Sequence, residues 1–325
     1  GSIDRSSKRS LSIRLAVMAL LAEADLALNA VKLLLALSLL LQCMEDRKII
    51  NSLGVLPFGS WALLGHDLKA GWPQCFKALA WLFEARRLSY LVAARAFVAL
   101  FMLLSAALAI YVRHQSNSDE IALLTSSPWA IVLSSATLIS AGIVVLWMSQ
   151  VFWMIRWRGT LNGGSDAMSL SLLNALMLGE ICRFGLPLAD IKLQNIAAQL
   201  SLWFIVIQSL SSYVVSGAIK LRDPNWRNGL ALTHFLDASV HGPLKSTSLF
   251  RTKGIARLAS WGFTLWECAM PLLLLHPYLA VMACLAAFGF HSMVLWYFGL
   301  NRFLWAWSSC FPALIYAAFA LKSMS

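Results

Sequence analysis

Three ionisable residues stand inside or at the end of long apolar runs, where they could carry proton chemistry. Lys220 ends the apolar run that begins at Asn195, Glu267 lies within W-G-F-T-L-W-E-C-A-M-P, and His291 lies within F-G-F-H-S-M-V-L-W. A charge inside a bilayer costs roughly 2.5–3.5 kcal/mol, so such residues usually face the protein interior and pair with something. An amine, a carboxylate and an imidazole on three successive spans could therefore converge at one depth. Glu267 would then steady the charge of Lys220 or His291, and His291 would orient a bound ring through a hydrogen bond.

Lys220 permits two interpretations, and the sequence leaves both open. It could be a snorkelling anchor, whose stem lies along apolar surface while its ammonium reaches water. Alternatively, it could be a partly desolvated amine, which loses its proton because burial disfavours the charged form and which then acts as a base near neutral pH. Glu267 and His291 likewise suit a paired structural role as well as a chemical one.

The composition determines the class of protein that must position these residues. The chain has 325 residues, of which 59% are hydrophobic and 13% charged, and its mean hydropathy is +0.71. Ordinary soluble domains do not have this composition, and several apolar runs exceed the roughly 18–20 residues that cross a bilayer as a helix. We therefore predict an all-α, polytopic integral membrane bundle, with one transmembrane domain over residues 1–325. The net charge of +11 is spread over span ends, which indicates contact with membrane lipids and not with nucleic acid.

The apolar runs predict about eight spans, with two amphipathic stretches at 74–87 and 226–240 lying in the membrane interface. The first span contains Glu23, Asp25 and Lys32. Either an amphipathic surface helix precedes it, or one long helix keeps these charges on a protected face. The predicted spans are 11–42, 90–112, 128–154, 167–186, 195–219, 258–276, 278–299 and 303–321.

The membrane orientation stays open. A basic tail over residues 1–10 predicts a cytoplasmic start. With eight spans, however, the loop after the fifth would face outward, although it is rich in bases from Arg222 to Arg257. The six cysteines form no C-x-x-C pair, and Cys43 and Cys75 could bridge in an oxidising compartment. No metal site is predicted.

A glycine-rich turn over residues 159–166 leads into a helix that Ser165 or Asp166 could cap through the free amides of its first turn. Its glycines match no phosphate-binding pattern.

At the lysine the sequence resembles a known family. The stretch Y-V-V-S-G-A-I-K-L-R-D-P-N-W-R-N-G, residues 213–229, resembles the motif of the horizontally transferred transmembrane (HTTM) superfamily, which includes the vitamin K-dependent gamma-glutamyl carboxylases. Downstream, F-H-S-M-V-L-W-Y-F-G-L-N-R-F looks like the second block of that family, and Glu267 falls where the family often has an acidic residue. Weaker landmarks are N-S-L-G-V-L-P and G-G-S-D. The matching positions are Tyr213, Gly217, Lys220, Leu221, Trp226, Gly229, Phe290, His291, Phe298 and Phe303.

The resemblance implies a lysine base. In the carboxylases, the matching lysine is thought to deprotonate reduced vitamin K, whose reaction with oxygen gives a base strong enough to take a proton from glutamate. By this resemblance Lys220, His291 and Glu267 would be catalytic, and the cofactor would be a reduced quinone. Two departures argue against glutamate carboxylation. The carboxylases have a large domain after the membrane part, whereas this sequence ends at Ser325, and their Asn-His pair is missing near Gly164-Ser165-Asp166. The residues that would bind the substrate or lipid are Tyr213, Gly217, Trp226, Gly229, Asp166 and Phe290.

In size the chain is similar to the SdpB-like membrane subunits of bacterial sporulation-delaying-peptide systems, which mature a secreted toxin peptide together with a small partner protein. This similarity implies a bacterial inner-membrane location and a peptide substrate. The first hypothesis is therefore a membrane enzyme, or enzyme subunit, acting on a peptide or a quinone through Lys220. The second is a non-catalytic scaffold or immunity-type binding protein. A transporter ranks third, because the sequence shows no internal repeat and no matched pair of broken helices.

Overall fold

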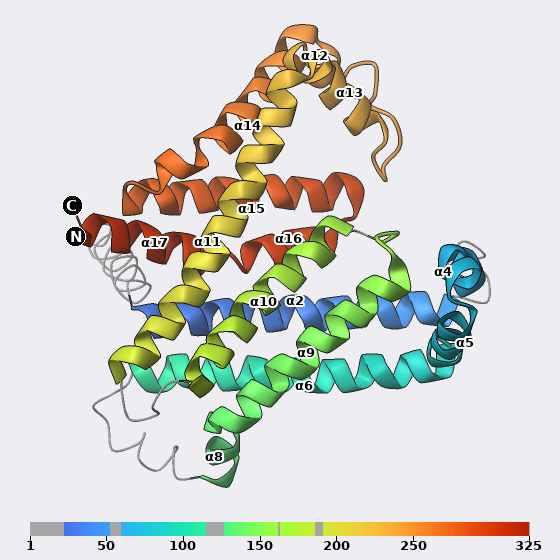
Figure 1. Ribbon diagram of the computed structural model, residues 1–325. Coiled ribbons are helices and arrows are strands. Elements are labelled where there is room, and N and C mark those ends of the chain that lie inside the picture. Colours follow the sequence, from blue (N-terminus) through green and yellow to red (C-terminus); the bar gives the residue numbers. More distant parts are fainter. Residues whose placement is uncertain (1–22, 53–59, 115–126, 162, 186–190, 325) are drawn as a thin grey trace, which may run out of the picture. The chain divides into compact units, whose positions relative to one another are not determined.

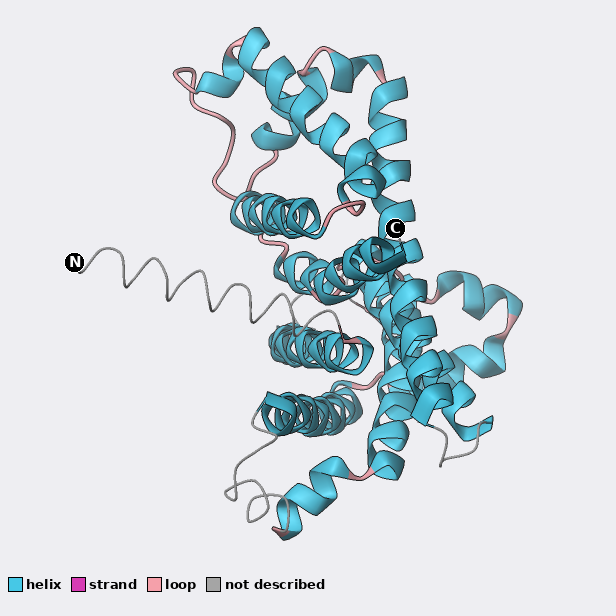
Figure 2. Ribbon diagram, turned by 90° about the vertical axis from the view of Figure 1, so that its left-hand side faces the viewer, coloured by secondary structure: helices cyan, strands magenta, loops and turns pink. Residues whose placement is uncertain are grey.

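The computed structural model describes residues 23–52, 60–114, 127–161, 163–185 and 191–324. All regular structure in these ranges is helical, as predicted (Figure 1, Figure 2). The predicted basic tail over residues 1–10 lies outside the described residues, as does most of the N-S-L-G-V-L-P landmark. The long helices are α2 (Ala24–Ser52), α6 (Ala85–His114), α9 (Ala136–Trp157), α10 (Gly163–Gly185), α11 (Ile191–Arg222), α14 (Lys253–Leu273), α15 (Pro277–Phe298) and α17 (Phe311–Met324).

Shorter helices connect the long ones. The sequence favours them where proline stands at the first helical position, since its missing amide is one that needs no partner there. They are α3 (Trp61–Leu64), α4 (His66–Gly71), α5 (Pro73–Leu82), α8 (Pro128–Ser134), α12 (Pro224–Arg227), α13 (Leu230–Asp237), the 3-10 turn η2 (Leu249–Arg251) and α16 (Asn301–Ser308).

Six stretches within the described residues are long and apolar enough to cross a membrane. They support an integral membrane protein with transmembrane helices, as predicted. Helices α10 and α14 stand where the fourth and sixth spans were predicted, but they are not among the six stretches, so the number eight is not shown. The six stretches are α2, α6, α9, Asn195–Arg222 of α11, α15, and Asn301–Met324 across α16 and α17.

Several predicted boundaries move, each for a local reason. Helix α2 continues past residue 42 to Ser52, because no glycine or proline interrupts residues 24–52. Lys32 lies buried within this helix, whereas Glu23 and Asp25 at its start are exposed, so the three charges do not share one protected face. The predicted 128–154 span is divided at Ser135, whose hydroxyl accepts the Leu138 amide as the cap of α9. The interfacial stretch 226–240 is likewise divided at Gly229, which adopts φ +84°.

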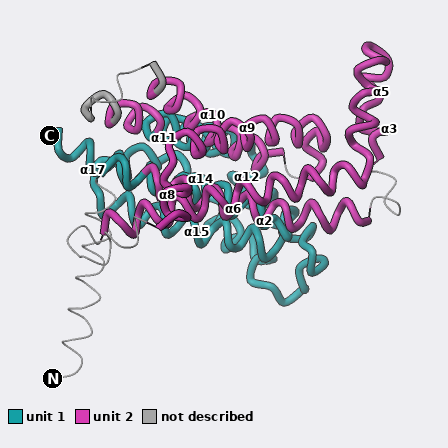
Figure 3. Tube along the Cα trace, turned by 90° about the horizontal axis from the view of Figure 1, so that it is seen from below, with its two compact units in different colours: residues 1–27, 202–325 teal, residues 28–201 magenta. Residues whose placement is uncertain are grey.

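The chain divides into two compact units (Figure 3). One comprises residues 28–201 and includes α2 from residue 28 onward, together with α6, α9 and α10. The other comprises residues 1–27 and 202–325, and includes α11 from residue 202 and everything after it. The single domain predicted over residues 1–325 stays a prediction.

Candidate functional site

The predicted pairing of an amine with a carboxylate is found in the second unit, where the end of α11 packs against the middle of α14. Lys220 Nζ lies 2.6 Å from Oε1 and 2.5 Å from Oε2 of Glu267. The two side chains are only 14% and 5% exposed. The ammonium is therefore turned towards a carboxylate and away from bulk water, which differs from the snorkelling interpretation.

Ser216 completes the surroundings of the lysine. One helical turn before Lys220, its hydroxyl accepts a hydrogen bond from Nζ at 2.8 Å and donates one to Glu267 Oε1 at 3.3 Å. An ammonium group has three hydrogens to donate, and the two carboxylate oxygens and this hydroxyl are three acceptors. The geometry is thus that of an ammonium–carboxylate pair with every hydrogen placed. The Trp226 ring, with its centroid 5.3 Å from Nζ, adds a cation–π contact.

Two glycines allow this close packing. A Cβ on Gly217 would lie 2.6 Å from Cys268 Sγ and 3.0 Å from the Cys268 amide nitrogen, so α11 and α14 approach one turn below the ion pair. At Gly229 the backbone has φ +84°, and a Cβ would lie 2.5 Å from the Arg257 amide nitrogen. The turn between α12 and α13 therefore lies directly on the first part of α14. Both glycines act on the site through packing, and their predicted role in ligand binding stays a prediction.

His291 belongs to a second, neighbouring cluster in the same unit. Its Nε2 lies 3.0 Å from the hydroxyl oxygen of Tyr213 on α11, and no hydrogen bond or ion pair of the described residues joins it to Lys220 or Glu267. Both side chains are buried. Tyr213 is seven residues before Lys220, about 10 Å along the helix. The rings around this pair, at centroid distances of 5.0 to 5.6 Å from Tyr213 or His291, are Trp266, Phe290, Phe303 and Trp307.

Three nitrogens in this aromatic cluster have no hydrogen-bond partner among the residues that the structure describes. They are His291 Nδ1, Trp266 Nε1 and Trp307 Nε1, and all are buried. Leaving a buried polar group unpaired costs about 1–3 kcal/mol, so each such group needs an explanation. A ligand that brings oxygen acceptors among these rings would satisfy the indole donors and offset that cost.

Asp166 lies in the other compact unit. It is buried within the first turn of α10, which begins at Gly163, so it follows the helix start instead of capping it. Its backbone carbonyl accepts a hydrogen bond from Gln150 Nε2 at 3.1 Å. The predicted site residues therefore lie in three places: the Lys220–Glu267 pair with Trp226 and the two glycines, the Tyr213–His291 cluster with Phe290, and Asp166.

A buried polar cluster that was not predicted from the sequence lies in the unit formed by residues 28–201. Arg95, on α6, is 1% exposed. Its Nη2 donates to Gln42 Oε1 on α2 at 3.2 Å and to Gln150 Oε1 on α9. Gln42 Nε2 in turn donates to Ser169 Oγ on α10 at 3.1 Å. The sequence did contain an indication of this cluster, because an arginine inside the predicted 90–112 span needs a polar partner.

The remaining sequence expectations concern metals and disulfides. Within the described ranges no group of three or more histidine, cysteine or acidic residues could hold a metal ion. Cys43 is buried and Cys75 exposed, and no disulfide joins the two.

No protein-family model matches the sequence, and neither a curated protein nor a solved structure matches it significantly.

Proposed function

We propose that this chain is a membrane enzyme, or the membrane subunit of one, that uses Lys220 as a general base on a peptide or a quinone-like lipid. The observation that carries the proposal is the Lys220–Glu267 pair, in which both carboxylate oxygens lie within 2.6 Å of the amine. A charge pair this dry is expensive to keep for stability alone, because apolar residues of similar volume often serve as well. The resemblance of residues 213–229 to the HTTM motif agrees with this role.

The pair suggests how the amine could become a base. If one proton passes from Nζ to a Glu267 oxygen, the ammonium and the carboxylate become a neutral amine and a carboxylic acid. The net charge of the pair stays zero. The Nζ lone pair is then free to accept a proton from a substrate hydroxyl. Ser216 would hold Nζ in position during the exchange, since it contacts both partners.

The aromatic cluster fits a ring-shaped ligand with oxygen substituents. Trp266 and Trp307 would donate their unpaired indole hydrogens to those oxygens, and His291 and Tyr213 would orient them. A bound reduced quinone would supply the acidic ring hydroxyl on which a base could act. Because the rings pack within 5.0 to 5.6 Å of one another, at least one of them has to move aside for a ligand.

We further propose that α10 and α14 cross the membrane as well, giving eight spans. Helix α10 is antiparallel to α9 and contacts it at both ends, through the Asp166 carbonyl to Gln150 and through Glu180 to Ser140 at 2.5 Å. Asp166 and Glu180 are fourteen positions apart, which corresponds to about 21 Å of helix. A helix that follows a spanning neighbour over this distance shares most of its depth. A bacterial inner membrane, a peptide substrate and a small partner protein belong to the same proposal.

The decisive experiment compares Lys220→Arg with Lys220→Met in purified protein. Arginine keeps the positive charge but does not give up its proton at accessible pH. We expect Lys220→Arg to stay folded, to stop the consumption of vitamin K hydroquinone, and to leave any quinone extracted with the protein unchanged. Lys69→Arg, at an exposed position, is the matched control. If Lys220→Arg and Lys220→Met both consume the quinol at the wild-type rate, Lys220 is not the base.

A second candidate function is a non-catalytic scaffold or immunity-type binding protein. One observation favours it: all three ammonium hydrogens of Lys220 already have acceptors, so the cluster is complete without a ligand. In that case Lys220→Arg would retain the biological function, which it would lose if Lys220 were a base. Lys220→Met would lower the melting temperature under either function, because it leaves Glu267 unpaired.

A further inference from the structure

Residues 222–257, the basic extension, connect the end of α11 to the first turn of α14. It is attached at the ends of two apolar helices of its own unit. It continues directly from α11 at Arg222, and the Val240 amide donates to the Tyr297 carbonyl at 2.8 Å in the last turn of α15. His241 Nε2 lies 3.0 Å from the Trp296 carbonyl oxygen beside it. Because both helices are candidate spans, the extension lies where the membrane interface is expected.

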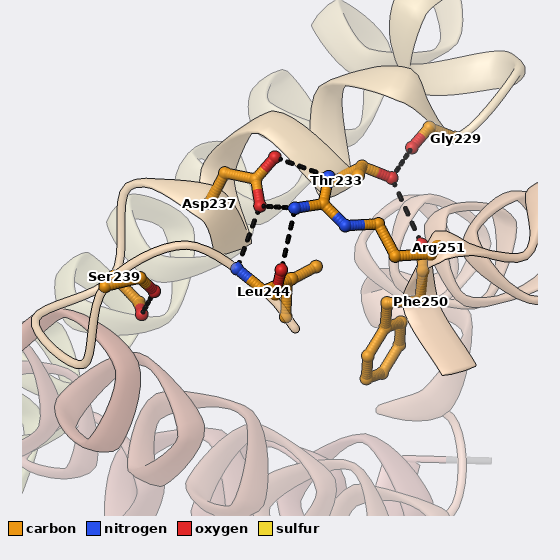
Figure 4. Close-up of polar contacts among 8 residues, drawn as sticks. Gly229, Thr233, Asp237, Ser239, Leu244, Phe250 and Arg251 are labelled. Atoms are coloured by element: carbon orange, nitrogen blue, oxygen red, sulfur yellow. Dashed lines mark hydrogen bonds and ion pairs between the residues drawn. The ribbon is translucent and has the colours of Figure 1, made fainter. Parts of the chain in front are cut away.

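The basic extension presents an excess of positive charge to the solvent. It contains six bases and two acids, a formal net charge of +4. Both acids are used internally: Asp223 accepts the Asn225 amide at 2.8 Å as the cap of α12, and Asp237 holds Arg251 through two bonds of 2.7 and 2.8 Å (Figure 4). The five other bases are exposed and make no side-chain hydrogen bond or ion pair with any described residue. They are Arg222, Arg227, Lys245, Lys253 and Arg257.

Large apolar side chains stand exposed among these bases. Phe235, Val240 and Leu249 are 54%, 63% and 70% exposed. The Asp237–Arg251 pair keeps this loop in place, because Arg251 also donates to the Leu244 carbonyl and the Leu244 amide donates to Asp237 (Figure 4). A surface that combines free bases with exposed apolar side chains is the pattern of interfacial segments that bind anionic lipids.

We infer that the basic extension docks on the anionic phospholipid headgroups of the leaflet from which α11 and α15 emerge. The free bases contact lipid phosphates, and the exposed apolar side chains enter the headgroup region. An acidic peptide would satisfy the bases too, but the attachment to two span ends places the extension beside headgroups before any partner arrives. Docking would also hold α12, and with it Trp226, against Lys220. The inference does not depend on a catalytic role for Lys220.

A spin label at Leu249 tests the inference in the full-length protein. Leu249→Cys is labelled in a Cys75→Ser background, and the protein is placed in nanodiscs of phosphatidylcholine alone or with phosphatidylglycerol. Access of oxygen and of a water-soluble nickel chelate to the label reports its depth. We expect phosphatidylglycerol to raise oxygen access and lower nickel access, and added salt to reverse both changes.

Variants that lack three bases of the extension are compared with a control that lacks three bases elsewhere. Each base near an anionic surface strengthens binding by about fivefold, so K245Q/K253Q/R257Q should lower the docked-to-undocked ratio about a hundredfold. The control K69Q/K77Q/R86Q removes three exposed bases from the other unit and should leave the label unchanged. The inference would be overturned if the label had the same depth in both lipids, or if added salt left its depth unchanged. It would also be overturned if the label became immersed only when an acidic peptide was added.

Discussion

Removing one partner of the Lys220–Glu267 pair should destabilise the protein far more than removing both. Glu267→Leu leaves the ammonium with only Ser216 and Trp226, and Lys220→Met leaves the carboxylate with one hydroxyl donor. Breaking a buried pair in this way costs about 3–5 kcal/mol, whereas replacing both charges with apolar side chains is often close to neutral. Since Lys220 is still 14% exposed, we expect about 3 kcal/mol for each single variant. The double variant K220M/E267L should cost at least about 2 kcal/mol less than the sum of the two singles.

The free energy of unfolding of the four proteins, measured in mixed micelles titrated with a denaturing detergent, gives this coupling energy. The matched control is the Asp237–Arg251 pair, which has the same charge types but side chains 28% and 37% exposed. Exposed pairs contribute about 1 kcal/mol or less and weaken with salt. The reasoning would be refuted by a Lys220–Glu267 coupling no larger than that of the control, or one that vanishes in high salt.

Three further predictions follow from packing and burial. Gly217→Ala should lower the free energy of unfolding by about 1–3 kcal/mol, because the new methyl group meets Cys268. Gly262→Ala on α14, where a Cβ meets nothing within 4 Å, should raise it by about 0.5–1 kcal/mol; equal effects of the two would contradict the close approach of the helices. Arg95→Met should cost about 1–3 kcal/mol for the amide oxygens that it leaves unpaired, measured in the same titration, while exposed Arg86→Met should cost almost nothing. Cys75 should react with a maleimide in the folded protein and Cys284 only after unfolding, which mass spectrometry would register.

The Lys220–Glu267 pair was predictable because a charge in an apolar run is costly unless it is paired with a polar group in the protein interior. What the sequence could not decide is which of the three polar groups would pair. An apolar run does not specify the rotation of a helix about its axis, so Glu267 and His291 were equally available to Lys220. In the structure His291 instead contacts Tyr213, a residue that only the family resemblance had singled out. The roles of the two glycines were also hidden, because close approach of backbones is a property of the packed helices and not of either segment.

The two long helices that are missing from the six candidate spans both carry buried polar groups, as several of the six do. In α10 these include Ser165, Asp166, Ser169 and Glu180, and in α14 they include Ser260, Thr264 and Glu267. Each polar side chain that faces the interior lowers the mean hydropathy of its helix, although it never meets lipid. A helix that supplies such groups therefore cannot also be uniformly apolar. Mean hydropathy therefore underestimates such a helix, although α11 with Lys220 and α15 with His291 are still apolar enough to be candidate spans. Packing against neighbouring helices is a second guide to the number of spans, as α10 against α9 illustrates.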